Sequence, residues 1–315
     1  MWKSGVAALL ASAVLTPSMA ATGDFERGMN TMWEVLWHQS GTPTRLVRWE
    51  EDLKLRIHGV DVAKHREHTL QALRDVAAES GRQVIDVTDV PESSQQANVH
   101  IEIVPDQALS DDQPCETRLN YRTEARLESV TMQMRSRDAR RCAYHESMHV
   151  MGVRGHPGGE TVLSYFPSQV HGLAPLDKAM LRAWYSPRTQ GGMTPFEVLP
   201  ILADELAAVM PDAAEAGAAR ERFLARTVAQ MQAFAEGRGD VPAIVRESGK
   251  SSAEGIRMGR REVSYFLGIA YQRGTTVPRD DAQAARWLQQ AATMGSRTAQ
   301  LRLGAAAATA AAGSR

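Results

Sequence analysis

Cysteine is scarce in this chain of 315 residues, in which only Cys115 and Cys142 occur. Neither belongs to a C-x-x-C pair, so a cysteine-based zinc site is disfavoured. In an oxidising compartment an even pair instead predicts a disulfide bond. Such a bond would close a loop of about 27 residues and stabilise the fold by roughly 3 kcal/mol. Two buried free thiols are the alternative.

An excess of charge and long apolar runs are lacking as well. The chain has 36 basic and 37 acidic residues, and it has no extended basic run. This balance excludes a typical nucleic-acid-binding surface. No segment supplies the roughly 20 apolar residues that a membrane span needs. A hydrophobic content of 43% still permits ordinary cores, and the length allows about two domains.

The amino terminus has the pattern of a secretory signal peptide. Lys3 precedes an apolar run from Gly5 to Leu15, which small residues follow. The pattern predicts cleavage after Ala20, with Ala21 as the alternative, so that residues 1–20 form the signal peptide. We therefore expect a periplasmic or secreted protein.

The most informative motif that is present is His145-Glu146-Ser147-Met148-His149-Val150-Met151-Gly152, with His156 just beyond it. Residues four apart share one face of a helix, so His145 and His149 can bind one metal ion. Glu146 can take a proton from a metal-bound water. Gly152 can adopt the left-handed conformation that ends a helix and turns the chain back, which makes His156 the expected third ligand. The motif predicts a zinc hydrolase, and the alternative is a surface helix that carries two histidines.

The stretch from Cys142 to Tyr185 resembles the metzincin metalloproteases. Within it, Thr161-Val162-Leu163-Ser164-Tyr165-Phe166 is similar to the serralysin-type turn. In that family a methionine forms the turn beneath the zinc, and a tyrosine two residues later reaches the metal or the oxyanion. The resemblance assigns this second role to Tyr165. Leu163 stands where the family has methionine, a change that costs under about 1.5 kcal/mol.

The third histidine departs from the family spacing H-E-x-x-H-x-x-G-x-x-H, which would place it at position 155. That position is Gly155, and the histidine comes one residue later, at His156. A ligand must come within about 2.0–2.1 Å of zinc. Gly155 and the following Pro157-Gly158-Gly159 can absorb the additional residue in a flexible turn. His171 is the alternative third ligand.

The same region also resembles an uncharacterised family of bacterial envelope proteins. The resemblance rests on Cys142 and on the run L-x-P-L-D-x-x-x-L-R-x-x-Y-x-P-R, which ends at Arg188. Some members of that group lack the metal histidines, whereas this chain has both.

Periodicity predicts an α/β (α+β) layered domain over residues 45–190, preceded by an arm at 21–44. Alternating apolar residues indicate strands at 53–57, 99–104 and 127–134, and helical spacing indicates a helix over 62–80 that ends at Gly81. This order gives a twisted sheet with an active-site helix, which is the metzincin-like arrangement that the motif implies. His65 and His68 are interpreted as surface residues, with a second metal site as the alternative. We expect Trp33, Trp37 and Trp49 to cover an apolar edge of the domain, with a ligand-binding aromatic patch as the alternative.

After Gly192 the chain becomes rich in alanine, and two helices broken near Pro211 are predicted in a connecting region at 195–245. In residues 246–315, Leu267-Gly268 recurs as Leu303-Gly304, a pattern that resembles the Sel1-like repeat. Such repeats are helical hairpins that generally bind proteins. One and a fraction units cannot bury their own faces, so they should pack on the 195–236 helices. A helical cap that only stabilises the first domain is the alternative.

Together these features predict a zinc-dependent metallopeptidase acting on protein or peptide substrates. Zn²⁺ would be held by His145, His149 and His156, with Glu146 as the base and Tyr165 assisting at the oxyanion. The competing hypothesis is a catalytically silent envelope protein that binds partners through its Sel1-like helices.

Overall fold

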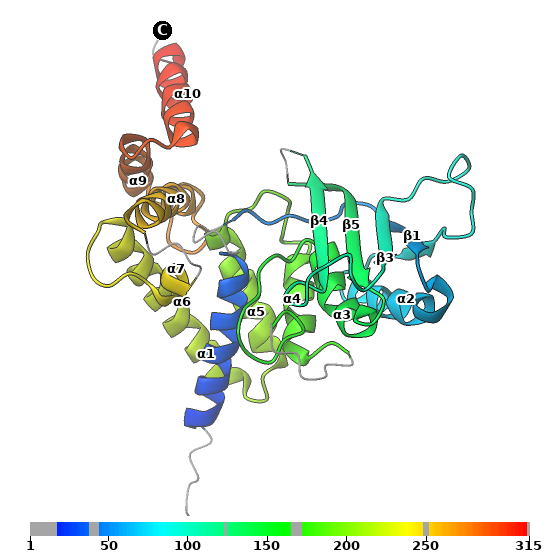
Figure 1. Cartoon of the computed structure of the whole chain (residues 1–315). Coiled ribbons are helices and arrows are strands. Elements are labelled where there is room, and N and C mark those ends of the chain that lie inside the picture. The colour runs from blue at the N-terminus through cyan, green and yellow to red at the C-terminus, as the bar shows by residue number, and fades with distance from the viewer. Residues whose placement is uncertain (1–17, 38–43, 123–124, 165–171, 248–251, 314–315) are drawn as a thin grey trace, which may run out of the picture.

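The computed structural model describes residues 18–37, 44–122, 125–164, 172–247 and 252–313 (Figure 1). A mixed five-stranded sheet with its helices is followed by an all-helical region, which confirms the predicted fold class. In Figure 1 the sheet lies on the right and the later helices lie on the left.

The strands of the sheet lie in the order β2-β1-β3-β5-β4. β1 is parallel to β2 and β3, β3 is parallel to β5, and β4 runs antiparallel to β5 at the edge. The strands are β1 (Leu53–Gly59), β2 (Val84–Asp86), β3 (Val99–Val104), β4 (Cys115–Tyr121) and β5 (Leu127–Arg135).

The three central strands were predicted correctly because each alternates apolar and polar residues. In β1, for example, Leu53, Leu55 and Ile57 are buried, with exposed fractions of 0 to 3%. The sequence did not predict β2 and β4. β2 has only three residues, and β4 reads as the mostly polar CETRLNY because an edge strand is only partly covered.

Two helices, α2 (Val62–Ala78) and α3 (Ala139–Val150), pack against each other and against the sheet. α2 contacts β1 and β2, whereas α3 contacts β4 and β5. The interpretation of His65 as a surface residue was wrong. Because α2 packs on α3, His65 is only 8% exposed, and its Nε2 lies 3.1 Å from Oγ of Ser136.

The expected tryptophan edge was also wrong, since Trp33, Trp37 and Trp49 are 6%, 1% and 0% exposed and belong to the core. Trp33 lies on α1 (Ser18–Val35), a helix that packs on two helices of the later region. The arm expected at 21–44 is therefore largely helical and anchored by buried apolar side chains.

The remaining helices are α4 (Pro175–Trp184), α5 (Pro195–Val209), α6 (Ala213–Ala235), α7 (Ala243–Glu247), α8 (Ala253–Arg273), α9 (Asp281–Thr293) and α10 (Arg297–Gly313). The break near Pro211 is confirmed, and α8 packs on α5 and α6, as expected for a repeat that cannot stand alone. Each of the last two helices packs on the one before it, and α10 projects from the end of the row in Figure 1.

Over the described residues, no helix is both long enough and apolar enough to cross a membrane. The predicted disulfide is present between Cys115 on β4 and Cys142 on α3, with Cα atoms 6.2 Å apart. It links the edge strand of the sheet to the helix that carries the histidine motif.

Replacement of both cysteines by alanine should lower the free energy of unfolding by about 3 kcal/mol, because the open chain regains the entropy of a 27-residue loop. Urea unfolding of the oxidised wild type and of the Cys115→Ala/Cys142→Ala variant measures the difference. Wild type unfolded in the presence of a reductant is the matched control and should behave like the variant. Equal stability of all three samples would contradict the prediction.

Candidate metal centre

The metal motif lies on the last two turns of α3, where His145 and His149 share one face. The helix ends as predicted at Gly152, which has φ +86°. A side chain at this position would place its Cβ 2.2 Å from the backbone oxygen of Val47, so only glycine fits. The turn sends the chain back toward the histidines.

Two aromatic side chains from distant segments satisfy carbonyl groups at this helix end. Nε1 of Trp49 donates a hydrogen bond to the oxygen of Val150, and the hydroxyl of Tyr185 donates to that of Met151, both at 2.8 Å. Carbonyls at a buried helix end need such partners. Trp49 and Tyr185 therefore hold the carboxyl end of α3 in place.

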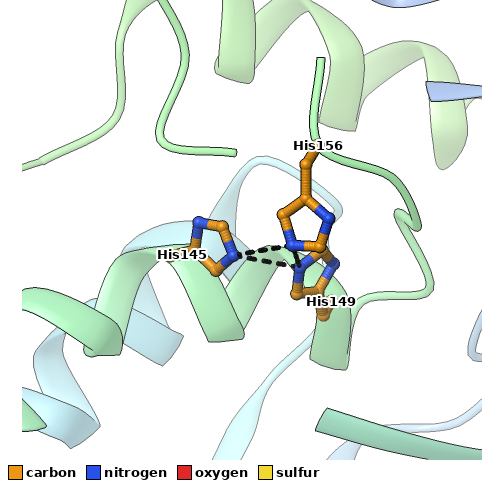
Figure 2. Close-up of side chains that lie close together, drawn as sticks. All are labelled: His145, His149 and His156. Atoms are coloured by element: carbon orange, nitrogen blue, oxygen red, sulfur yellow. Dashed lines mark hydrogen bonds between the residues drawn. The ribbon is translucent and has the colours of Figure 1, made fainter. Parts of the chain in front are cut away.

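The structure brings the Nε2 atoms of three histidines to one point (Figure 2). His156 Nε2 lies 3.1 Å from both His145 Nε2 and His149 Nε2, which are 3.2 Å apart. His156 comes from the loop after α3, so this loop absorbs the one-residue shift. Gly155 contributes to the turn with φ +108°.

Backbone carbonyls determine the tautomer of the two helical histidines. Nδ1 of His145 lies 2.8 Å from the oxygen of Val162, and Nδ1 of His149 lies 2.7 Å from that of Val153. A carbonyl oxygen only accepts, so both Nδ1 atoms carry the proton. The neutral rings then turn their Nε2 lone pairs toward each other.

Facing lone pairs at about 3 Å repel unless a cation or a proton lies between them. Three neutral imidazoles suit zinc and related transition metals. On a tetrahedral shell with bonds of about 2.0–2.1 Å, ligand nitrogens lie about 3.3 Å apart, close to the spacing found here. The donor set therefore fits a metal ion, and its carbonyl partners provide the outer support that metal-bound histidines usually have.

Burial keeps the first histidine neutral. Desolvation, followed by the nearby His149, lowers the pKa of His145 to about 4. An imidazole that stays unprotonated near neutral pH is ready to bind a metal without first losing a proton.

The carbonyl that orients His145 belongs to the turn that contains Leu163, a position where the sequence predicts an apolar role. Leu163 is fully buried, as the apolar role requires. The turn is held by Asp177 on α4, a fully buried carboxylate that accepts hydrogen bonds from the Thr161 hydroxyl and the Val162 amide. Asp177 thus supports His145 through the peptide at Val162.

Glu146 is 2% exposed, and its Oε2 accepts a hydrogen bond of 2.6 Å from the hydroxyl of Thr117 on β4. Desolvation raises the pKa of Glu146, and the neighbouring His145 and the Thr117 hydrogen bond partly oppose this rise. Thr117 and Cys115 are two apart on a strand, and Glu146 and Cys142 are four apart on a helix, so each pair shares a face. The disulfide and the Thr117–Glu146 hydrogen bond therefore both join one face of β4 to one face of α3.

A cleft of about 760 Å³ exposes the three histidines and Glu146 together. One wall is β4 with the preceding segment, and it carries Asp111, Asp112 and Glu116. Arg154, after α3, lies on another part of the wall. The candidate metal site therefore opens into this cleft.

Two residues from the sequence predictions, Tyr165 and the alternative ligand His171, lie outside the described residues. Among the residues that the structure does describe, the three histidines of the motif are the only potential metal-binding group. His65 and His68 form no second group in that part of the chain. Their Nε2 atoms instead contact Ser136 and the Arg140 carbonyl.

Sequence reasoning did not find Thr117, Trp49 or the carbonyls of Val153 and Val162. Each contacts the motif only after folding, and a backbone carbonyl has no signal in the sequence. Because β4 was not predicted from the sequence, the spacing of Cys115 and Thr117 gave no indication of this contact either.

The fold and the site define a layered α/β protein with a potential metal centre and a helical carboxy-terminal region. Residues 29–155 match the family model described as a protein of unknown function (DUF2927), and residues 262–296 match the Sel1 repeat. The chain thus combines a DUF2927 domain with a Sel1 repeat. The first match includes Glu146 and two of the histidines and ends one residue before His156. Neither a curated protein nor a solved structure matches the chain.

His156→Ala should weaken zinc binding by at least about 100-fold, the upper end of losses seen when only outer partners of ligands are removed. A competitive titration with a chelator measures the affinity. His58→Ala, at an exposed position on β1, is the matched control and should bind as the wild type does. A larger loss in His171→Ala than in His156→Ala would move the third ligand to His171.

The metal-free protein should lose stability as the pH falls from about 6.5 toward 4. His145 has a lower pKa in the folded chain than its usual 6.5, so the unfolded chain binds more protons in this range. The loss should reach a few kcal/mol at most. Urea unfolding of chelator-treated protein across this range, with His145→Gln for comparison, measures it. The variant should have a shallower slope below pH 6.5, and identical slopes would contradict the assignment.

Proposed function

We propose that this chain is a zinc-dependent metallopeptidase of metzincin type, with its catalytic region at residues 45–190. One observation carries the proposal: three histidine Nε2 atoms within 3.2 Å of one another share a cleft with the buried carboxylate that follows the first histidine. His145, His149 and His156 would hold the zinc. When bound, zinc supplies a Lewis acid that activates water and polarises a carbonyl.

Glu146 acts as the general base and then as the general acid. Its carboxylate removes a proton from the attacking water and delivers it to the leaving amine. Burial raises the pKa of Glu146, which makes the carboxylate a stronger base than an exposed glutamate. The Thr117 hydroxyl holds Oε2 and thereby leaves the other carboxylate oxygen for the water.

Tyr165 is proposed to assist at the oxyanion, as the metzincin resemblance implies. The substrates are proteins or peptides, which would bind in the cleft beside β4.

The disulfide is consistent with an oxidising compartment outside the cytoplasm. We place the mature protein in the periplasm or outside the cell, after removal of a signal peptide that ends near Ala20. The helical regions at 195–245 and 246–315 then extend from the catalytic region.

A second candidate function is that of an envelope protein without catalysis, which binds partner proteins through the Sel1 region. The match of residues 262–296 to the Sel1 repeat favours it, because such repeats generally bind proteins. A Glu146→Ala variant that still binds the partner proteins of the wild type would favour this candidate.

The primary test is zinc content together with hydrolysis of casein or a peptide library. Atomic spectroscopy should find one zinc per chain in the wild type and none in His145→Ala/His149→Ala. A wild type that takes up no zinc after loading would overturn the proposal.

Glu146→Gln should retain zinc and lose at least about 100-fold of the hydrolysis rate, because the amide keeps the size of the side chain but cannot take a proton. Glu67→Gln, at an exposed position on α2, is the matched control and should keep the full rate. Tyr165→Phe should cost less than Glu146→Gln. Equal rates in Glu146→Gln and the wild type would identify any activity as contamination.

Thr117→Val should also reduce the rate, by less than Glu146→Gln does, because the base remains but is no longer held by a hydrogen bond. Thr117→Ser keeps the hydroxyl and should restore most of the rate. Zinc content should be the same in the wild type, Thr117→Val and Thr117→Ser. A full rate in Thr117→Val would show that this contact has no part in catalysis.

A further inference from the structure

The third ligand candidate is placed differently from the other two. His145 and His149 lie on a helix, whereas His156 lies in a loop with glycine at positions 155, 158 and 159. Gly155 and Gly159 have φ +108° and +103°. Glycine-rich segments lose much conformational entropy when they are ordered, so a ligand in such a loop needs contacts that hold it.

Two side chains of α1 supply such contacts. The hydroxyl of Thr31 donates a hydrogen bond of 2.9 Å to the oxygen of Gly158, and the amide of Gly158 donates one of 3.1 Å to Oε2 of Glu34. Thr31 and Glu34 are three apart and lie on the same face of α1. They engage both polar backbone groups of a single residue, two positions after His156.

The next residue lies equally close to the helix. A Cβ at Gly159 would lie 2.9 Å from Oγ1 of Thr31. Thr31 is only 7% exposed, so the hydrogen bond to Gly158 is shielded from water. The loop and α1 are in direct contact although they are more than 120 residues apart in the sequence.

The helix itself is firmly held. Phe25, Met29 and Met32 are fully buried, and α1 packs on α5 and α6. Gly28 lies so close to Leu206 of α5 that an added Cβ would be 2.9 Å from it. A contact with α1 therefore ties the loop to the well-packed core of the helical region.

We propose that Thr31 and Glu34 are positioning residues for the metal centre, which fix His156 through Gly158. The inference rests on the metal-binding part of the proposed function. It explains how a histidine one residue late still meets the other two Nε2 atoms. It also makes α1, which lies outside the catalytic region proposed above, a required part of the metal site.

The test is the metal affinity of Thr31→Val/Glu34→Ala, measured with zinc by chelator competition. We expect affinity to fall by about 10- to 100-fold, as for other outer partners of metal ligands. Cobalt(II) bound in place of zinc gives a second readout, because its visible absorption changes when a ligand leaves the shell. The conservative variant Thr31→Ser/Glu34→Gln keeps both hydrogen-bonding groups and should bind within about threefold of the wild type.

Glu26→Ala is the matched control on the same helix, since Glu26 pairs with Arg226 of α6 and not with the loop. It should leave metal affinity unchanged. Circular dichroism and thermal unfolding verify that each variant is folded. If the double variant loses its fold, Thr31→Val alone serves, because it removes one hydroxyl at nearly constant volume, and it should still weaken binding.

A double-mutant cycle shows whether the effect passes through His156. In a His156→Ala background, loss of Thr31 and Glu34 should weaken binding no further. An equal loss with and without His156, or wild-type affinity in the folded double variant, would overturn the positioning role and leave the proposed function standing. Absence of zinc binding by the wild type would overturn both.

Discussion

The candidate site depends first on two hydrogen bonds, from Nδ1 of His145 and His149 to the carbonyl oxygens of Val162 and Val153. They place the ring protons on the outer nitrogens and direct both Nε2 lone pairs inward. Without them either ring could rotate or change tautomer, and the three nitrogens would not form a common donor set. The turn at Gly152 and the turn held by Asp177 serve to present these carbonyls. The orientation of the potential metal ligands thus depends on the backbone of two loops.

The helix that carries the motif is held on several sides by segments far apart in the sequence. At one end the disulfide joins it to the edge strand β4, and at the other Trp49 and Tyr185 bind its last carbonyls. Between these points, Thr117 contacts Glu146. Catalytic groups need positions accurate to a fraction of an ångström, which packing and outer hydrogen bonds supply. Strand β4 and the segments that carry Trp49 and Tyr185 together fix the position of α3 and its histidines.

The helical region is more than an addition to the sheet domain. Helix α1 packs on α5 and α6, and α8 packs on the same two helices, so the Sel1 repeat and α1 share one core. The buried side chains of the sheet domain and of the helical region form one continuous hydrophobic cluster. This arrangement relates the two candidate functions, because α1, whose Thr31 and Glu34 contact the loop of the third histidine, packs on the same two helices as α8 of the repeat.

The sequence by itself determined the central strands, the motif helix, the disulfide pair, the helix break near Pro211 and the repeat. The strands, the helices and the repeat depend on local periodicity and on turn residues, and two cysteines allow only one disulfide. All of this can be read from one sequence. Tertiary structure alone decided that β4 forms the edge, that Trp49 and His65 are buried, and that His156 reaches the other histidines. These outcomes depend on contacts between residues far apart in sequence. Such contacts form only when the chain folds, because each buried side chain and each long-range hydrogen bond needs a partner from a distant segment.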